Sequence, residues 1–127
     1  MVRVSHLLVA IAAGCLAARA AEAHPRLVAA TPAADAVVAG PATIELKFNE
    51  PVVAQFSGIT LQMTDKPGMK MSTPSEIAVG ASKLAADRTT LSAKLAKPLA
   101  TGTYRVLWHA VTADTHRVEG SYSFTVK

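Results

Sequence analysis

Residues 43–48 read Thr-Ile-Glu-Leu-Lys-Phe, and this stretch decides the fold class. Apolar and polar side chains alternate strictly along it. In an extended chain, Ile44, Leu46 and Phe48 therefore lie on one face and the polar side chains on the other. This pattern predicts a half-buried β-strand.

The same alternation returns along the rest of the chain. It predicts four further strands, at residues 58–63, 89–95, 103–112 and 121–126. Pro and Gly residues separate the strands, at 31–32, 40–41, 67–68 and 98–102. No stretch after residue 23 shows a period of 3.6 over three turns. Short strands at this spacing predict one all-β domain, either an antiparallel sandwich or a Greek-key barrel.

The N-terminal region has the pattern of a secretory signal peptide. Arg3 precedes the apolar run LLVAIAAGCLAA at 7–18, and the small residues Ala21 and Ala23 follow. This pattern predicts a signal peptide over residues 1–23, cleaved after Ala23. The apolar run is too short and too rich in alanine for a membrane span. Two alternatives are a retained N-terminal anchor helix and lipidation of Cys15.

Composition limits what the exported domain, residues 24–127, can be. Half of all residues are hydrophobic and 17% are charged, which excludes a disordered chain and a coiled coil. Cleavage would lower Lys+Arg from 13 to 11 and Asp+Glu from 9 to 8, so the formal net charge falls from +4 to +3. That charge is too weak and scattered to favour nucleic acid. Cleavage also removes the single Cys, so a metal would need His, Met, carboxylate or amine ligands.

His24 becomes the first residue after the predicted cleavage. Its free amine, with an ordinary pKa of about 7.7–8.0, and its imidazole can chelate one metal ion. Amine and imidazole nitrogens suit a tetragonal Cu(II) ion. Pro25 has no N–H, so the adjacent amide cannot compete as a ligand. The alternative is that cleavage exposes a histidine by chance.

A second candidate metal-binding feature is Asp114-Thr115-His116. In an extended segment, residues two apart point to the same side, so a carboxylate and an imidazole would lie together. With His24 they would complete a tetragonal set of N and O ligands. The alternative is a turn aspartate beside an exposed histidine. His109, on a predicted strand, is interpreted as an ordinary surface histidine.

Met63, Met69 and Met71 lie within LQMTDKPGMKM and are all the methionines after residue 23. Thioethers favour Cu(I), so these residues are candidates for a Cu(I) site. The Pro-Gly pair between them predicts a flexible, exposed loop. For Met63 the alternative is core packing, because it is in phase with the apolar residues of strand 58–63.

Motifs of enzymes are missing from the sequence. There is no G-x-S-x-G elbow, no phosphate-binding Gly-rich loop and no acidic pair with a spacing that favours acid–base catalysis. We therefore predict a binding protein and not an enzyme.

Four segments together resemble the CopC family of periplasmic copper-binding proteins associated with copper resistance. They are HPRL at 24–27, TPAADAVV at 31–38, LKFNEPV at 46–52 and GTYRVLWHAVTADTHRVEGSYSFTV at 102–126. The resemblance covers the whole of residues 24–127. It implies a periplasmic location and a cupredoxin-like Greek-key β-barrel or sandwich, in agreement with the strand pattern.

The resemblance also implies two copper sites. Cu(II) would be held by the amine and imidazole of His24, by Asp114 and by His116, with Glu50 as a weak ligand or a neighbour of the ligands. Some family members carry a Cu(I) site in a Met-rich loop, and Met63 and Met69 match two of its positions. Met71 lies close to where the family has a histidine.

This sequence departs from the family pattern in that loop. It has no histidine there, and Lys66 and Glu76 stand in a region where further methionines are typical.

The expected function is a non-catalytic copper carrier or buffer that contributes to copper resistance. The family resemblance implies a separate CopD-like inner-membrane protein as a partner. One alternative is a copper oxidase of the histidine-brace type, similar to lytic polysaccharide mono-oxygenases. Another is a metal-free β-sandwich adhesion module.

Overall fold

The structure is a computed structural model, and it describes residues 25–127. The predicted signal peptide, its cleavage site and His24 lie outside the described residues. Within the described part of the chain, no helix is long and apolar enough to cross a membrane.

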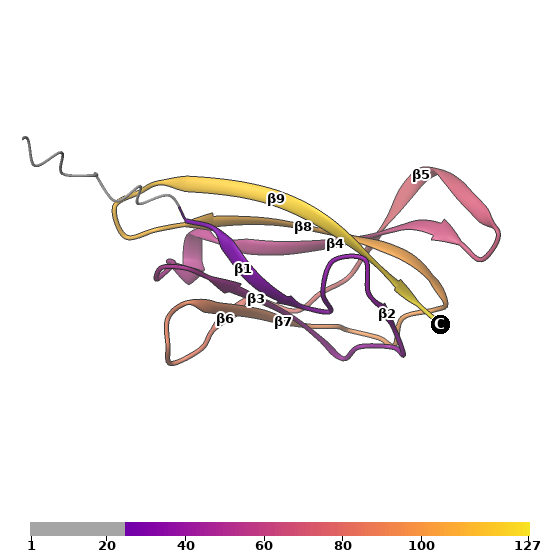
Figure 1. Cartoon of the computed structure of the whole chain (residues 1–127), viewed down its shortest axis with the longest axis horizontal. Helices are drawn as coiled ribbons and strands as arrows, with labels where there is room; N and C mark the ends of the chain where they lie inside the picture. Colours follow the sequence, from indigo (N-terminus) through magenta and orange to yellow (C-terminus); the bar gives the residue numbers. More distant parts are fainter. Residues whose placement is uncertain (1–24) are drawn as a thin grey trace, which may run out of the picture.

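Residues 25–127 form nine β-strands in two sheets (Figure 1). In chain order the strands are β1 (Leu27–Thr31), β2 (Val37–Val38), β3 (Thr43–Phe48), β4 (Gly58–Lys66), β5 (Met69–Ile77), β6 (Lys83–Leu84), β7 (Thr90–Lys94), β8 (Gly102–Val111) and β9 (Arg117–Val126). A short 3-10 turn, η1 (Ala54–Phe56), precedes β4.

One sheet has the order β1-β3-β7-β6 and the other the order β2-β9-β8-β4-β5. The chain passes from one sheet to the other after β1, after β2, after β3, after β5 and after β7. Neighbouring strands are antiparallel except for the short parallel pair β2 and β9. This arrangement confirms the predicted all-β Greek-key sandwich.

The core forms where the alternating faces of the two sheets meet. Ile44, Leu46 and Phe48 of β3 are at most 1% exposed, as the alternation predicts. They face the sheet that holds Tyr104 and Phe124, whose rings stack with centroids 5.7 Å apart. Both sheets and this core lie within residues 25–127.

Strands on the free edges of the sheets were not predicted. β5 is an edge strand whose side chains are mostly exposed, so its sequence carries no apolar alternation. β1 is likewise an edge strand, and β2 and β6 have only two residues each. A strand that buries neither face strongly leaves no period of two in its sequence.

The segment around Pro67-Gly68 corrects one expectation. Instead of a flexible loop, it forms a tight turn that joins β4 to β5, with Lys66 and Met69 as direct cross-strand partners. Gly68 has a φ of +71°, a left-handed conformation that glycine adopts without strain. Met69 and Met71 therefore lie on a strand.

Candidate metal centre

Asp114 and His116 lie in the tight turn between β8 and β9. The Thr112 N–H donates to the carbonyl of His116 at 3.0 Å, and the Thr115 N–H donates to the carbonyl of Thr112 at 2.9 Å. Thr115 has a φ of +68°, which reverses the chain direction. The segment is thus a turn and not the extended stretch expected from the sequence.

The turn brings together the two side chains that the sequence pairs. Nδ1 of His116 lies 2.9 Å from Oδ2 of Asp114. The side chains are 57% and 52% exposed, respectively. One nitrogen and one oxygen donor are therefore adjacent and accessible at this end of the sandwich.

Thr112 positions Asp114, and sequence reasoning missed this residue. Thr112 is only 3% exposed, and its hydroxyl donates a short hydrogen bond to Oδ1 of Asp114. This hydrogen bond, assisted by the backbone and side chain of His116, holds the pKa of Asp114 below its ordinary value of 3.8, although partial desolvation opposes the shift. The carboxylate therefore stays negatively charged into mildly acidic solution.

A second segment packs against the end of β8. Val52 forms an isolated antiparallel bridge with Thr112, and the Val53 N–H donates to the carbonyl of Val111 at 2.7 Å. The buried hydroxyl of Ser57 accepts a hydrogen bond from the Val111 N–H at 3.0 Å. These contacts hold residues 52–57 beside the start of the turn.

Glu50 reaches the same end of the molecule through this segment. It lies two residues before Val52, while Asp114 lies two residues after Thr112. Glu50 is half-buried, and among the described residues it makes no ion pair or hydrogen bond with Asp114 or His116. The structure therefore places Glu50 at the same end of the molecule as Asp114 and His116.

The first described residues are also fastened at this end. The Arg26 N–H donates to Oδ1 of Asn49 at 2.6 Å, and the Asn49 N–H donates to the Arg26 carbonyl at 3.0 Å. Sequence reasoning did not single out Asn49, because no local pattern links two residues 23 positions apart. Residues 25–127 contain no group of three or more His, Cys, Asp or Glu side chains that could hold a metal ion.

The three methionines belong to the β4–β5 hairpin, which lies at the opposite end of the five-stranded sheet from the β8–β9 turn (Figure 1). β4 runs nine residues, about 25 Å, from Gly58 beside His109 to Lys66 at the hairpin turn. Met63 is 9% exposed and packs in the core, whereas Met69 is 56% exposed. Met71 is partly buried against the core.

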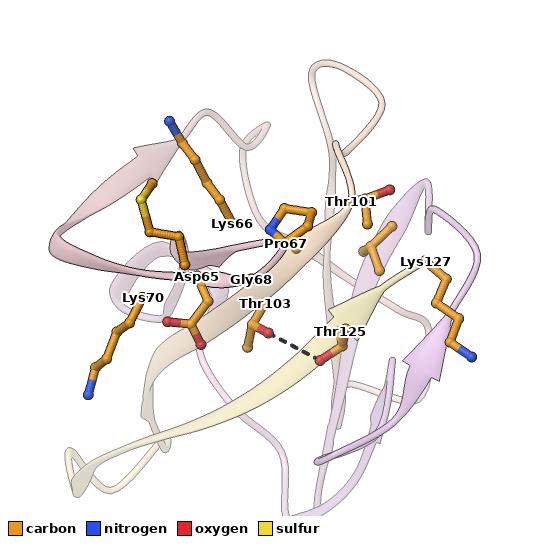
Figure 2. A pocket seen from close by; sticks show the side chains of 12 residues that line it. Asp65, Lys66, Pro67, Gly68, Lys70, Thr101, Thr103, Thr125 and Lys127 are labelled. Atoms are coloured by element: carbon orange, nitrogen blue, oxygen red, sulfur yellow. Dashed lines mark hydrogen bonds between the residues drawn. The ribbon is translucent and has the colours of Figure 1, made fainter.

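Met69 lines a groove beside the β4–β5 hairpin, and Figure 2 shows this groove. Lys66, Lys70 and Lys127 line it, together with Asp65 and a pair of threonines, Thr103 and Thr125, whose hydroxyls are 3.3 Å apart. Three cationic side chains make this end of the molecule electrostatically unfavourable for a metal cation.

His109 lies on the outer face of β8, opposite Gly58 and Glu119. Its ring covers Gly58 so closely that a Cβ there would come within 2.8 Å of Cε1. Its half-buried position on the strand is that of an ordinary sheet residue, as predicted.

Comparison with known proteins shows the family to which the chain belongs. A family model described as the CopC domain matches residues 27–127. The chain is 46% identical over 119 residues to Copper resistance protein C of Xanthomonas campestris pv. juglandis, covering 94% of this chain and 92% of that protein. It is 47% identical over 116 residues to Copper resistance protein C of Pseudomonas syringae pv. tomato, covering 91% and 90%.

The fold matches a solved structure as well. The crystal structure of PcoC, a methionine-rich copper resistance protein from Escherichia coli, superimposes with a TM-score of 0.75 and 41% identity, over 83% of this chain and 100% of that chain. Family model, relatives and structure agree over nearly all of the described residues. The chain therefore belongs to the CopC family.

Proposed function

We propose that this protein is a periplasmic copper carrier that contributes to copper resistance. It would bind Cu(II) through the amine and imidazole of His24, the carboxylate of Asp114 and the imidazole of His116. The related proteins named above are copper resistance proteins. The observation that carries the proposal is the pair of donor atoms on Asp114 and His116, 2.9 Å apart and accessible.

This separation suits two neighbouring ligands of one tetragonal ion. Metal bonds to imidazole nitrogen and carboxylate oxygen are about 2.0 Å long, so ligands at a right angle lie about 2.8 Å apart. The observed distance between Nδ1 of His116 and Oδ2 of Asp114 is 2.9 Å. Both donors could bind one Cu(II) if the imidazole and the carboxylate rotated so that their lone pairs converge on the ion instead of facing each other.

The remaining two donors would come from His24. Residue 24 is two residues before Arg26, and the chain can span at most about 7 Å over that distance. Arg26 is bonded to Asn49, which adjoins Glu50 on the segment bridged to Thr112. The attachment of the N-terminal segment thus favours an approach of His24 to the Asp114–His116 pair.

Electrostatics support a divalent cation at this end. Asp114 carries a negative charge that the Thr112 hydrogen bond stabilises, and Glu50 adds a second carboxylate in the neighbourhood. Imidazole and amine must lose their protons to bind a metal, so affinity for Cu(II) should fall steeply in acid.

We assign the site to binding and not to catalysis. Asp114 would occupy a coordination position that oxygen chemistry needs open. Donors that are about half exposed also allow another protein to exchange ligands with the bound ion. We propose a separate CopD-like inner-membrane protein as the partner in copper transfer.

A second, weaker site for Cu(I) is proposed at the hairpin. Met69 is exposed and Met71 partly buried on β5, and both could offer a thioether to this soft ion. Met63 would contribute only if the edge of the sheet opened, because its side chain is packed in the core. Lys66, directly opposite Met69, would weaken binding by charge repulsion.

The test compares two chains: one that begins at His24, and one with a single glycine before it. We expect the first chain to bind one Cu(II), with an EPR spectrum that reports three nitrogen ligands. The added glycine moves the amine away from the imidazole, so affinity should fall by at least a hundredfold. Equal affinities of the two chains would show that the terminal amine is not a ligand.

A further inference from the structure

Asn49 holds the N-terminal segment through both its side chain and its backbone. Its Oδ1 accepts a hydrogen bond from the Arg26 N–H, and its own N–H donates to the carbonyl of Arg26. Pro25, directly before Arg26, is buried. The chain is therefore fastened to the fold immediately after residue 24.

The same asparagine belongs to the segment that reaches the Asp114–His116 turn. Three residues after Asn49, Val52 bridges to Thr112, whose hydroxyl holds Asp114. Arg26 is thus linked to the carboxylate of Asp114 by the hydrogen bonds to Asn49, by the short stretch of chain from Asn49 to Val52, and by the bridge to Thr112. Through this connection, Arg26 and Asn49 can influence Cu(II) binding without contacting the ion themselves.

We infer that Asn49 is a positioning residue for copper binding, which fixes the start of the chain so that the nitrogens of His24 are in reach of Asp114 and His116. This inference rests on the proposed function. A chelating group on a loose terminus must lose backbone entropy when the metal binds. Because Asn49 orders Arg26 beforehand, it reduces that cost and raises the affinity.

The side-chain contribution can be removed while the backbone bond remains. In the chain that begins at His24, Asn49→Ala deletes the acceptor for Arg26, whereas Asn49→Asp keeps an oxygen at that position. We expect Asn49→Ala to weaken Cu(II) binding roughly tenfold, the size of one lost hydrogen bond, mainly through faster dissociation to a competing chelator. Asn49→Asp should restore at least most of the affinity.

A control variant removes a comparable hydrogen bond at the hairpin end. Thr64→Val deletes the bond from the Thr64 hydroxyl to the carbonyl of Thr103, 3.3 Å long. We expect Thr64→Val to leave Cu(II) affinity unchanged. Thermal unfolding of the copper-free variants checks that each one retains the fold.

A double-mutant cycle separates positioning of His24 from a general structural effect. Asn49→Ala is combined with the added glycine before His24, which already removes the amine–imidazole chelate. If Asn49 acts by positioning this chelate, Asn49→Ala should change Cu(II) affinity less than twofold in the extended chain. An undiminished tenfold loss there would overturn the inference, because Asn49 would then act on the site without His24.

The outcomes also separate the inference from the proposed function. If the added glycine weakens binding but Asn49→Ala alone does not, His24 is a ligand and the positioning role of Asn49 is wrong. If the added glycine changes nothing, the proposed ligand set itself fails, and the inference fails with it.

Discussion

The two ends of the sandwich carry candidate copper ligands of different chemical kinds, and the candidates differ in how close together the fold places them. At the β8–β9 turn, a carboxylate and an imidazole are adjacent and supported by a buried threonine. At the β4–β5 hairpin, three thioethers that are close in sequence are divided between the core and the surface. Proximity in sequence predicts a shared site only where the backbone turns both side chains to the same side.

The environments differ in charge as well. Two carboxylates, Asp114 and Glu50, lie at the turn end together with Arg117, whereas three lysines and one carboxylate, Asp65, line the groove at the hairpin end. The comparison predicts strong Cu(II) binding at the turn and weak Cu(I) binding at the hairpin. Five substitutions test this difference between the two ends, and they are given in order of decreasing expected effect.

His116→Ala should have the largest effect, because it removes a proposed ligand and the partner of Asp114. We expect Cu(II) affinity to fall by at least a hundredfold, or about 3 kcal/mol. The side chain is more than half exposed, so the melting temperature of the copper-free protein should hardly change. Calorimetric titration and EPR would measure the loss, and unchanged affinity would remove the turn from the site.

Gly102→Ala should damage the hairpin end and spare the turn. Gly102 has a φ of +155°, and a Cβ there would come within 2.5 Å of both the Asp65 carbonyl and the methyl group of Met63. We expect the free energy of unfolding to fall by about 2–3 kcal/mol, as for an overpacked core. Urea denaturation would measure it. Cu(II) affinity under native conditions should stay within twofold of the wild-type value.

Thr112→Val should show how much the buried hydroxyl contributes to the turn. Without this donor, the pKa of Asp114 should rise toward its ordinary value of 3.8. Protons would then compete with Cu(II) for the carboxylate at a higher pH. We expect the acid limb of the pH profile to shift upward, with weaker Cu(II) binding below about pH 4 and little change at pH 5, measured by titration between pH 3 and 7. An unchanged profile would mean that Asp114 is not a ligand.

Asp87→Asn tests the acid stability of the turn end. Asp87 accepts hydrogen bonds from the backbone of Thr89 and from Thr90, and these lower its pKa from 3.8 to about 2. A carboxylate with a lowered folded-state pKa stabilises the fold above pH 3.8 and loses this effect as the pH falls toward 2. Asp87→Asn should therefore flatten the pH dependence of stability between pH 4 and 2, measured by urea denaturation.

Met69→Leu should have the smallest effect. The side chain is 56% exposed, so its replacement should not change the stability of the fold measurably. Cu(I) affinity should fall only a few-fold, measured by competition with a Cu(I) chelator, and Cu(II) affinity should not change. A large loss of Cu(II) binding would contradict the separation of the two ends.

The strands that bury one face could be predicted from the order of the residues alone. Residues 43–48 were predicted as a strand with the observed bounds, because alternation along a half-buried strand is written directly into the residue order. The Asp114-x-His116 pair was also recognisable, since both donors lie within three residues. The edge strand β5 was missed, because its largely exposed side chains need no alternation.

The surroundings of each donor side chain depend on tertiary contacts and could not be predicted from the residue order. The Asn49–Arg26 pair and the Val52–Thr112 bridge join residues that are far apart in the chain, and no local pattern records such pairings. The burial of Met63 likewise depends on the sheets that pack around it. Side-chain chemistry and local periodicity are properties of the residue order. The contacts that orient a site form only when segments far apart in the chain pack against the same core.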